Sequence, residues 1–183
     1  MRSELRRYIE QDYWVYGVSE GDFEYTIALT RRIVNATYEL VRQEYARVRA
    51  SNPAQADDIM DDIVAHTVTD SFFVWHSCLW RMQGLLETMI VCTFLNRSNA
   101  QGLIGLRAKL LAMREAGFQI DDADWEALMD WGKVRNALSH APPERYRPGP
   151  LKEHDITEYH QLALKLCNDW RRQLASVANG PDA

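Results

Sequence analysis

The sequence predicts an all-α fold, an antiparallel helical bundle of about five helices. Apolar residues recur at three- and four-residue steps along nearly the whole chain, which is the spacing of a helix with one buried face. No segment sustains the alternation of apolar and polar residues that a half-buried strand requires. The chain has 183 residues, 46% of them hydrophobic, and no internal repeat or low-complexity linker, so we expect one domain over residues 1–183.

The first long helix is expected over residues 22–50, after a short N-terminal helix, with Asp22 as its N-cap. Its buried face is expected to carry Phe23, Ile27, Val34, Tyr38, Val41, Tyr45 and Val48. Residues 54–95 are interpreted as one long or once-broken helix. Its second part is apolar over most of its surface and is expected to form the centre of the core, through Phe72, Phe73, Trp75, Leu79, Trp80, Leu85, Leu86, Met89 and Ile90.

Two further helices are expected over about residues 102–116 and 121–141, separated by Gly117. The acidic stretch that opens the second of them suits the positive end of a helix dipole. Residues 142–150 contain four prolines and cannot be helical. The last helix is expected to begin with Asp155 or Thr157 as N-cap and to bury Ile156, Tyr159, Ala163, Leu166, Trp170 and Val177.

Composition favours a soluble, cytoplasmic protein without a membrane segment. The N-terminus lacks an apolar core of the signal-peptide type, and polar residues interrupt the most apolar run, residues 72–95. The three cysteines Cys78, Cys92 and Cys167 are unevenly spaced among apolar neighbours, so we expect buried thiols rather than a disulfide framework or a zinc site.

Charge is distributed unevenly along the chain, whose net charge is −5. Residues 53–70 hold five aspartates and no Lys or Arg, whereas residues 131–152 hold five basic residues against Glu144 alone. A local basic patch of this kind can hold a phosphate backbone. We therefore expect Lys133, Arg145 and Arg147 to contact RNA, although basic residues after a helix can also simply complement its dipole.

The segment Arg135-Asn136-Ala137-Leu138-Ser139-His140 lies at the end of the expected helix over 121–141. An arginine offers a planar fork of donors to phosphate oxygens, and a histidine can both accept and donate a proton near neutral pH. Together with an amide, these side chains can cleave a phosphodiester without a metal, so no cofactor or metal is expected. His140 falls in the last turn, where the helix dipole favours the imidazolium form.

Helix geometry points to a second copy of the chain. On an ideal helix, Ser139, Asn136 and His140 fall about 40°, 100° and 140° from Arg135, while Trp131, Leu138 and Val134 fall on the other side. We therefore expect the polar residues to face away from the buried side. One helix holds Arg135 and His140 poorly on a single phosphate, and a twofold homodimer would supply a second pair to the same cleft.

This segment resembles the motif of HEPN (higher eukaryotes and prokaryotes nucleotide-binding) domains, in which Arg is followed by four to six residues and His, commonly with Asn next to the Arg. Residues 72–178 fit the family pattern. The resemblance implies a metal-independent endoribonuclease that acts as a homodimer, with Arg135 and His140 as the catalytic pair and Asn136 as the orienting residue. Many such domains are toxins or anti-phage effectors, which makes an antitoxin protein a candidate partner. One subclass has a tyrosine two residues after the His, where this chain has Pro142.

In this mechanism His140 deprotonates the ribose 2′-hydroxyl or protonates the leaving 5′-oxygen, and Arg135 stabilises the charge on the phosphorane. Asn136 holds the phosphate or the imidazole, and the products carry 2′,3′-cyclic phosphate and 5′-hydroxyl ends. The alternative is a non-catalytic HEPN-like module that binds a nucleotide, an RNA or a protein through the same cleft.

Other polar groups leave further readings open. Asp57, Asp58, Asp61 and Asp62 form an aspartate-rich pattern, and Asp58, Asp62, His66 and Asp70 form a row at four-residue steps. They suit either magnesium in a diphosphate enzyme or, more simply, a solvated acidic face. Glu87 lies in the most apolar helix, where it either pairs with an arginine or the motif, or sits partly exposed at the surface. His76 is interpreted as a hydrogen-bonded core histidine.

Overall fold

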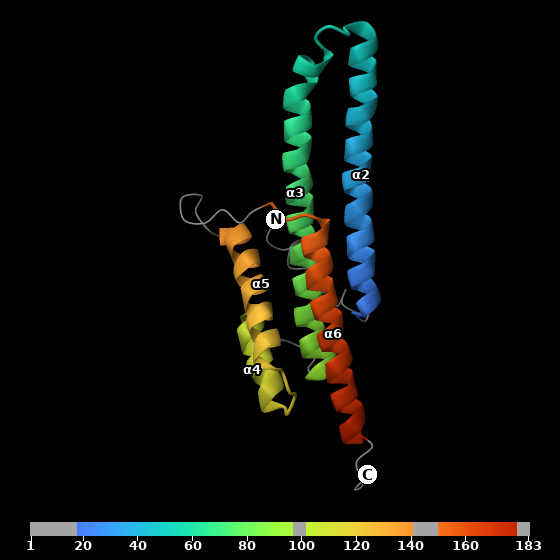
Figure 1. Ribbon diagram of the computed structural model, residues 1–183. Helices are drawn as coiled ribbons and strands as arrows, with labels where there is room; N and C mark the ends of the chain where they lie inside the picture. The colour runs from blue at the N-terminus through green and yellow to red at the C-terminus, as the bar shows by residue number, and fades with distance from the viewer. Residues whose placement is uncertain (1–17, 97–101, 141–149, 179–183) are drawn as a thin grey trace, which may run out of the picture.

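The computed structural model describes residues 18–96, 102–140 and 150–178 (Figure 1). Within these ranges it is all-α, with five α-helices and no strand, as the sequence predicts. The helices are α2 (Glu20–Ser51), α3 (Ala56–Met89), α4 (Gly105–Glu115), α5 (Asp122–His140) and α6 (Glu153–Ala178), and a π-helical turn, η2 (Ile90–Phe94), extends α3. None of the described helices is both long enough and apolar enough to span a membrane.

The two longest helices, α2 and α3, form an antiparallel hairpin (Figure 1). The other three helices pack along the half of α3 that is remote from the hairpin turn, and the remaining half of the hairpin extends beyond them. The backbone N–H of Leu151, just before α6, donates to Nε2 of His76 at 3.4 Å and marks where α6 begins along α3. α5 runs antiparallel to α3, and its C-terminal end lies near the middle of α3 (Figure 1).

Helix ends differ from the sequence prediction by a few residues, because the capping residues were misassigned. Ser19, not Asp22, is the N-cap of α2, and its backbone N–H donates to the Asp22 carboxylate at 2.8 Å. Similarly, α6 begins at Glu153, and Asp155 lies within its first turn, where its carboxylate accepts from the Lys152 N–H at 2.7 Å. α4 ends as expected at Gly117, whose φ of 94° closes the helix while the Phe118 N–H donates to the Met113 carbonyl.

The expected core is confirmed at most positions. Tyr38, Val41 and Tyr45 of α2 and Phe72 of α3 are only half-buried, and the side chain of Val177 lies outside the described part of the structure. Trp75, Leu79, Leu85, Leu86, Met89 and Ile90 are buried, together with Phe23 of α2 and with Ile156, Tyr159, Ala163, Leu166 and Trp170 of α6. Phe73 and Trp80, however, are 63% and 52% exposed. The prediction of core positions there was wrong because the described helices cover only part of the circumference of α3. Of the cysteines, Cys78 and Cys167 are buried, but Cys92 is exposed on η2, contrary to expectation.

Candidate functional site

Arg135 points into the bundle rather than away from it. Its Nη2 donates to Oε1 of Glu87 at 2.9 Å, and its Nε donates to Oε1 of Gln83 at 3.1 Å. Both acceptors lie on α3, one helical turn apart. The expectation that all the polar residues of the motif face away from the packed side is therefore wrong for Arg135. An arginine can occupy such a seam because its aliphatic stem packs while its guanidinium stays hydrogen-bonded.

Glu87 is the acceptor for two cations. Its second carboxylate oxygen, Oε2, accepts from Nζ of Lys109 on α4 at 2.7 Å. The Glu87 and Lys109 side chains are only 15% and 9% exposed, so water screens this cluster weakly. Of the two positions considered for Glu87 from the sequence, the structure confirms the pairing with the motif. Glu87, Lys109 and Arg135 thus form one cluster in which two cations share a single carboxylate.

Gln83 completes the cluster, and sequence reasoning missed it. Its side-chain amide donates through Nε2 to the Trp131 carbonyl of α5 at 2.9 Å, while Oε1 accepts from Arg135. Only 2% of Gln83 is exposed, and both ends of its amide are hydrogen-bonded. A signal was present in the sequence, because Gln83 and Glu87 are two polar residues one turn apart in the most apolar helix.

Tyr159 of α6 lies beside this cluster. Its ring packs edge-on against Trp131 with a centroid distance of 5.5 Å. Its hydroxyl is buried and has no hydrogen-bond partner among the residues that the structure describes. Burial is the main cause that raises the pKa of Tyr159, the negative charge of Glu87 raises it further, and Arg135 acts in the opposite direction. Tyr159 is therefore a neutral phenol at physiological pH and takes no part as a base.

The other expected site residues are placed only in part. Asn136 is exposed on α5. Lys133 is also exposed, and its Nζ donates to Asp130 at 2.7 Å, which raises the pKa of Lys133. His140 is the last residue of α5, but its side chain lies outside the described part of the structure, as do Arg145 and Arg147. Of the expected catalytic pair, the structure thus describes the side chain of Arg135 and links it to α3.

The two remaining polar candidates lie elsewhere. His76 is half-buried, accepts from the Leu151 N–H and contacts the Phe73 ring, and burial lowers its pKa. This agrees with its interpretation as a hydrogen-bonded core histidine. Asp57, Asp58, Asp61 and Asp62 are exposed near the hairpin turn, where Asp57 accepts from the Tyr45 hydroxyl. Among the residues the structure describes, no three His, Cys, Asp or Glu side chains converge as metal ligands.

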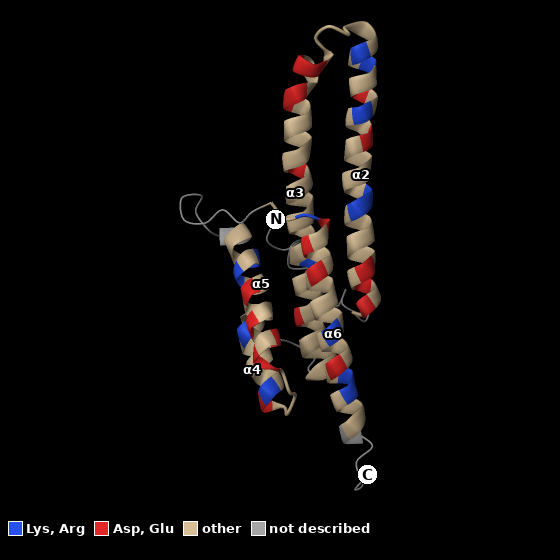
Figure 2. Cartoon of the chain, viewed as in Figure 1, with Lys and Arg blue, Asp and Glu red and all other residues tan. Residues whose placement is uncertain are grey.

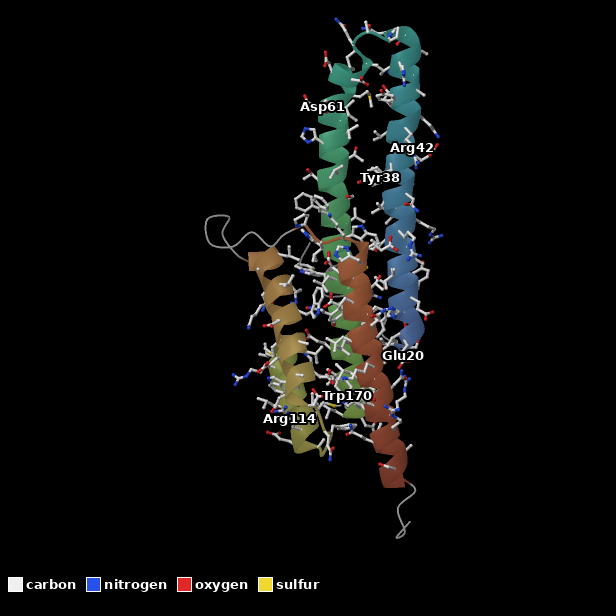
Figure 3. The ribbon with its side chains drawn as sticks, viewed as in Figure 1. Glu20, Tyr38, Arg42, Asp61, Arg114 and Trp170 are labelled. Atoms are coloured by element: carbon white, nitrogen blue, oxygen red, sulfur yellow. The ribbon has the colours of Figure 1, made fainter. Side chains whose placement is uncertain are left out.

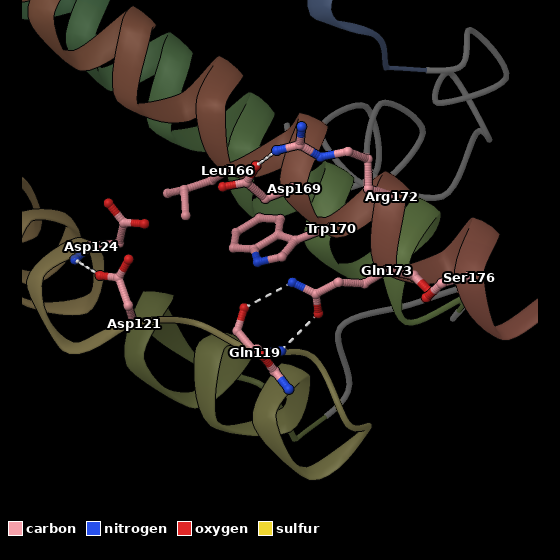
Figure 4. Close-up of a pocket in the computed structure, with 9 residues that line it drawn as sticks. All are labelled: Gln119, Asp121, Asp124, Leu166, Asp169, Trp170, Arg172, Gln173 and Ser176. Atoms are coloured by element: carbon pink, nitrogen blue, oxygen red, sulfur yellow. Dashed lines mark hydrogen bonds and ion pairs between the residues drawn. The ribbon is translucent and has the colours of Figure 1, made fainter.

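A pocket of about 480 Å³ lies at the opposite end of α5 from the motif (Figure 4). Trp170 lines it. Oε1 of Gln173 accepts a hydrogen bond from the Gln119 N–H at 2.8 Å, and Nε2 of Gln173 donates to the Gln119 carbonyl at 3.1 Å. Its three carboxylates each have a cationic partner, Asp121 and Asp124 in Lys165 and Asp169 in Arg172. The pocket is therefore a hydrogen-bonded and ion-paired junction between the start of α5 and the later turns of α6.

Comparison of the chain with protein-family models, with curated proteins and with solved structures finds no match.

Proposed function

We propose that this protein is a metal-independent endoribonuclease of the HEPN type. The observation that carries the proposal is the cluster of Arg135, Glu87 and Lys109, which holds the guanidinium of the motif in one orientation at the seam between α3 and α5. A preorganised cation of this kind stabilises the charge that develops on a phosphorane without reorganising during the reaction.

The roles follow the chemistry of the side chains. His140, at the C-terminal end of α5, moves the proton from the 2′-hydroxyl or to the 5′-oxygen, and the dipole of α5 favours its charged form. Arg135 stabilises the phosphorane, and Asn136, exposed one residue further along α5, holds the phosphate or the imidazole. Lys133, Arg145 and Arg147 hold flanking phosphates. RNA is the substrate, a second copy completes the cleft, and an antitoxin is a partner to seek in the neighbouring reading frame.

Cleavage of RNA in the presence of EDTA tests this proposal directly. We expect the purified protein to produce 2′,3′-cyclic phosphate and 5′-hydroxyl ends at the same rate with and without chelator, because no step uses a metal. An activity that disappears with EDTA and returns with Mg²⁺ would instead indicate a metal-dependent enzyme.

A second function is favoured by one specific observation. Arg135 is already engaged by Gln83 and Glu87, and such a network can serve simply to join α5 to α3. In that case the protein is a non-catalytic HEPN-like module that binds RNA or a nucleotide through the same cleft. Binding of RNA without any cleavage, unchanged in His140→Ala, is the result that would select this function.

A further inference from the structure

Two exposed aromatic side chains lie on α3 outside the cluster that holds Arg135. Phe73 and Trp80 are 63% and 52% exposed. Among the residues that the structure describes, they are the only exposed large apolar side chains in the second half of α3. A partner helix needs a continuous apolar stripe, whereas this half of α3 presents two separate rings to solvent. We call Phe73 and Trp80 the aromatic row.

Helix geometry aligns the aromatic row with Glu87. Phe73, Trp80 and Glu87 follow one another at steps of seven residues. On an ideal helix a step of seven residues is a rotation of about 20° beyond two turns, so the three residues lie within about 40° of one another around α3. The rise per residue places Trp80 about 10 Å and Phe73 about 21 Å from the level of Glu87. The aromatic row therefore leads along α3 to the carboxylate that holds Arg135.

The C-terminal end of α5 extends toward the aromatic row. α5 runs antiparallel to α3, and Arg135 contacts α3 at Gln83 and Glu87 (Figure 1). His140, the last residue of α5, follows Arg135 by five residues, or about 7.5 Å along the helix. The backbone of α5 therefore ends at about the level of Trp80. A nucleic acid whose phosphate reaches Arg135 and His140 has the aromatic row next to it along α3.

The Phe73 ring is oriented by contacts within the fold. It packs edge-on against the ring of His76, with a centroid distance of 6.0 Å and an interplanar angle of 84°. His76 in turn accepts a hydrogen bond from the Leu151 N–H at 3.4 Å. A ring that is already oriented loses less conformational entropy when a ligand stacks on it than a freely rotating side chain does.

The charges of α3 limit where an anionic chain can run. Residues 71–89 hold one acid, Glu87, which two cations engage, and one arginine, Arg81. Residues 56–70, toward the hairpin turn, hold five aspartates and no Lys or Arg (Figure 2). Asp61, in that acidic half, lies well beyond the C-terminal end of α5 (Figure 3). The aspartates repel a phosphate backbone, so the stretch of α3 that suits a nucleic acid is the one that carries the aromatic row.

We propose that Trp80 and Phe73 stack unpaired bases of a single-stranded RNA, on one side of the phosphate that Arg135 holds. Every base has a π-face, so stacking on aromatic side chains binds RNA with little dependence on its sequence. Bases that are paired and stacked within a duplex are not available to these rings. The inference rests on the proposed function and deepens it, because it names single-stranded RNA as the substrate class.

Binding of an RNA that cannot be cleaved tests the stacking separately from the chemistry. The probe is a short, labelled 2′-O-methyl RNA without self-complementarity, which has no free 2′-hydroxyl to attack its phosphates. We expect Trp80→Ala and Phe73→Ala each to raise the Kd about tenfold in fluorescence anisotropy, whereas Trp80→Phe, which keeps a ring, stays within about threefold of the wild type. The matched control is Tyr25→Ala, which removes a ring that is 62% exposed on α2 and should leave the Kd unchanged.

A series of probes that each lack one base identifies the contact as stacking. We expect the wild-type protein to bind one of these abasic probes about tenfold more weakly than the complete probe. Trp80→Ala should not distinguish that abasic probe from the complete one, because the contact is already lost. Annealing the probe to its complement should weaken binding to the wild-type protein. The abasic and duplex measurements use the wild-type protein, so they do not depend on the folding of a variant.

Four results would overturn the proposal. They are a wild-type protein that does not bind the probe, a duplex bound as tightly as the single strand, abasic probes that all bind like the complete one, and a Trp80→Ala variant, helical by circular dichroism, with the wild-type Kd. If that variant also has half the wild-type mass in light scattering, Trp80 instead contacts a second copy of the chain. Binding that depends on Trp80 without cleavage in EDTA contradicts only the endoribonuclease, whereas cleavage with a Kd independent of Trp80 contradicts only the stacking.

Discussion

Glu87 accepts a hydrogen bond from Arg135 at 2.9 Å and thereby ties the last turn of α3 to the last turns of α5. The partners are 48 residues apart in the chain, and Lys109 of α4 shares the same carboxylate. Three helices therefore meet at one buried charge, and the orientation of the guanidinium is set by the fold before any ligand arrives.

Replacing Glu87 tests how much the fold depends on this charge. Glu87→Gln keeps the shape but removes the carboxylate that Lys109 and Arg135 share, in a site whose side chains are 9% to 30% exposed. We expect the free energy of unfolding to fall by about 3 kcal/mol, measured by urea denaturation. The control is Glu39→Gln, whose exposed pair with Arg42 should contribute less than about 0.5 kcal/mol. Equal losses in the two variants would contradict the assignment.

Removing His140 tests the chemistry. We expect His140→Ala to abolish cleavage in EDTA while costing about 1 kcal/mol of stability or less, since it lies in the last turn of α5. The measurement is a cyclic-phosphate assay with thermal melts in parallel. Cleavage at the wild-type rate would remove the enzyme proposal, and a failure to fold would show that the histidine is structural.

Arg135 should respond to a conservative change. Arg135→Lys keeps the charge but loses the planar guanidinium that donates to both Gln83 and Glu87. We therefore expect the cleavage rate to fall about a hundredfold. Arg135→Ala should reduce the rate at least as far as His140→Ala does. Single-turnover rates at saturating RNA measure this effect. A lysine variant as active as the wild type would show that only charge, and not geometry, matters.

Arg145 and Arg147 follow the motif and lie outside the described residues. If they hold phosphates, the double Ala variant should bind RNA more weakly and show a flatter dependence of log Kd on log salt, by about one unit of slope for each lost contact. Fluorescence anisotropy over a salt series gives both quantities. An unchanged affinity and slope would mean that these arginines only complement the end of α5.

Acid should destabilise the fold through two histidines. Burial lowers the pKa of His76 and is also the main cause that lowers the pKa of His160, which Glu24 partly offsets. Below about pH 6.5 the unfolded chain therefore binds more protons at these histidines than the folded chain does. Their contribution to the free energy of unfolding is fully present above that pH and is lost as the pH falls below it. We expect Tm to fall between pH 7 and pH 5. His76→Gln should flatten the decline, while the exposed His154→Gln should follow the wild type.

Helical periodicity predicted the five helices, because a repeat of three and four residues marks a buried face wherever the chain is amphipathic. It failed for Phe73 and Trp80, since the second half of α3 is apolar over most of its surface and periodicity cannot tell which side its neighbours cover. It also placed Arg135 on the wrong side of α5. The prediction judged the exposed side of α5 from side-chain polarity alone. In the structure Arg135 faces inward because its partner, Glu87, is a polar residue on another helix. The bridging role of Gln83 depends on contacts across 48 and 52 residues, which no local pattern encodes.

The continuity of α3 has a consequence for how firmly the charged cluster is held. His76, which accepts from the Leu151 N–H where α6 begins, and Gln83 and Glu87 of the cluster belong to one unbroken helix, with Glu87 about three turns beyond His76. Such a helix behaves as a stiff rod, so Glu87 changes the angle at which it meets Arg135 only when α3 turns as a whole against α2 and α6. The rigidity of the whole hairpin therefore helps its two hydrogen bonds to hold the arginine.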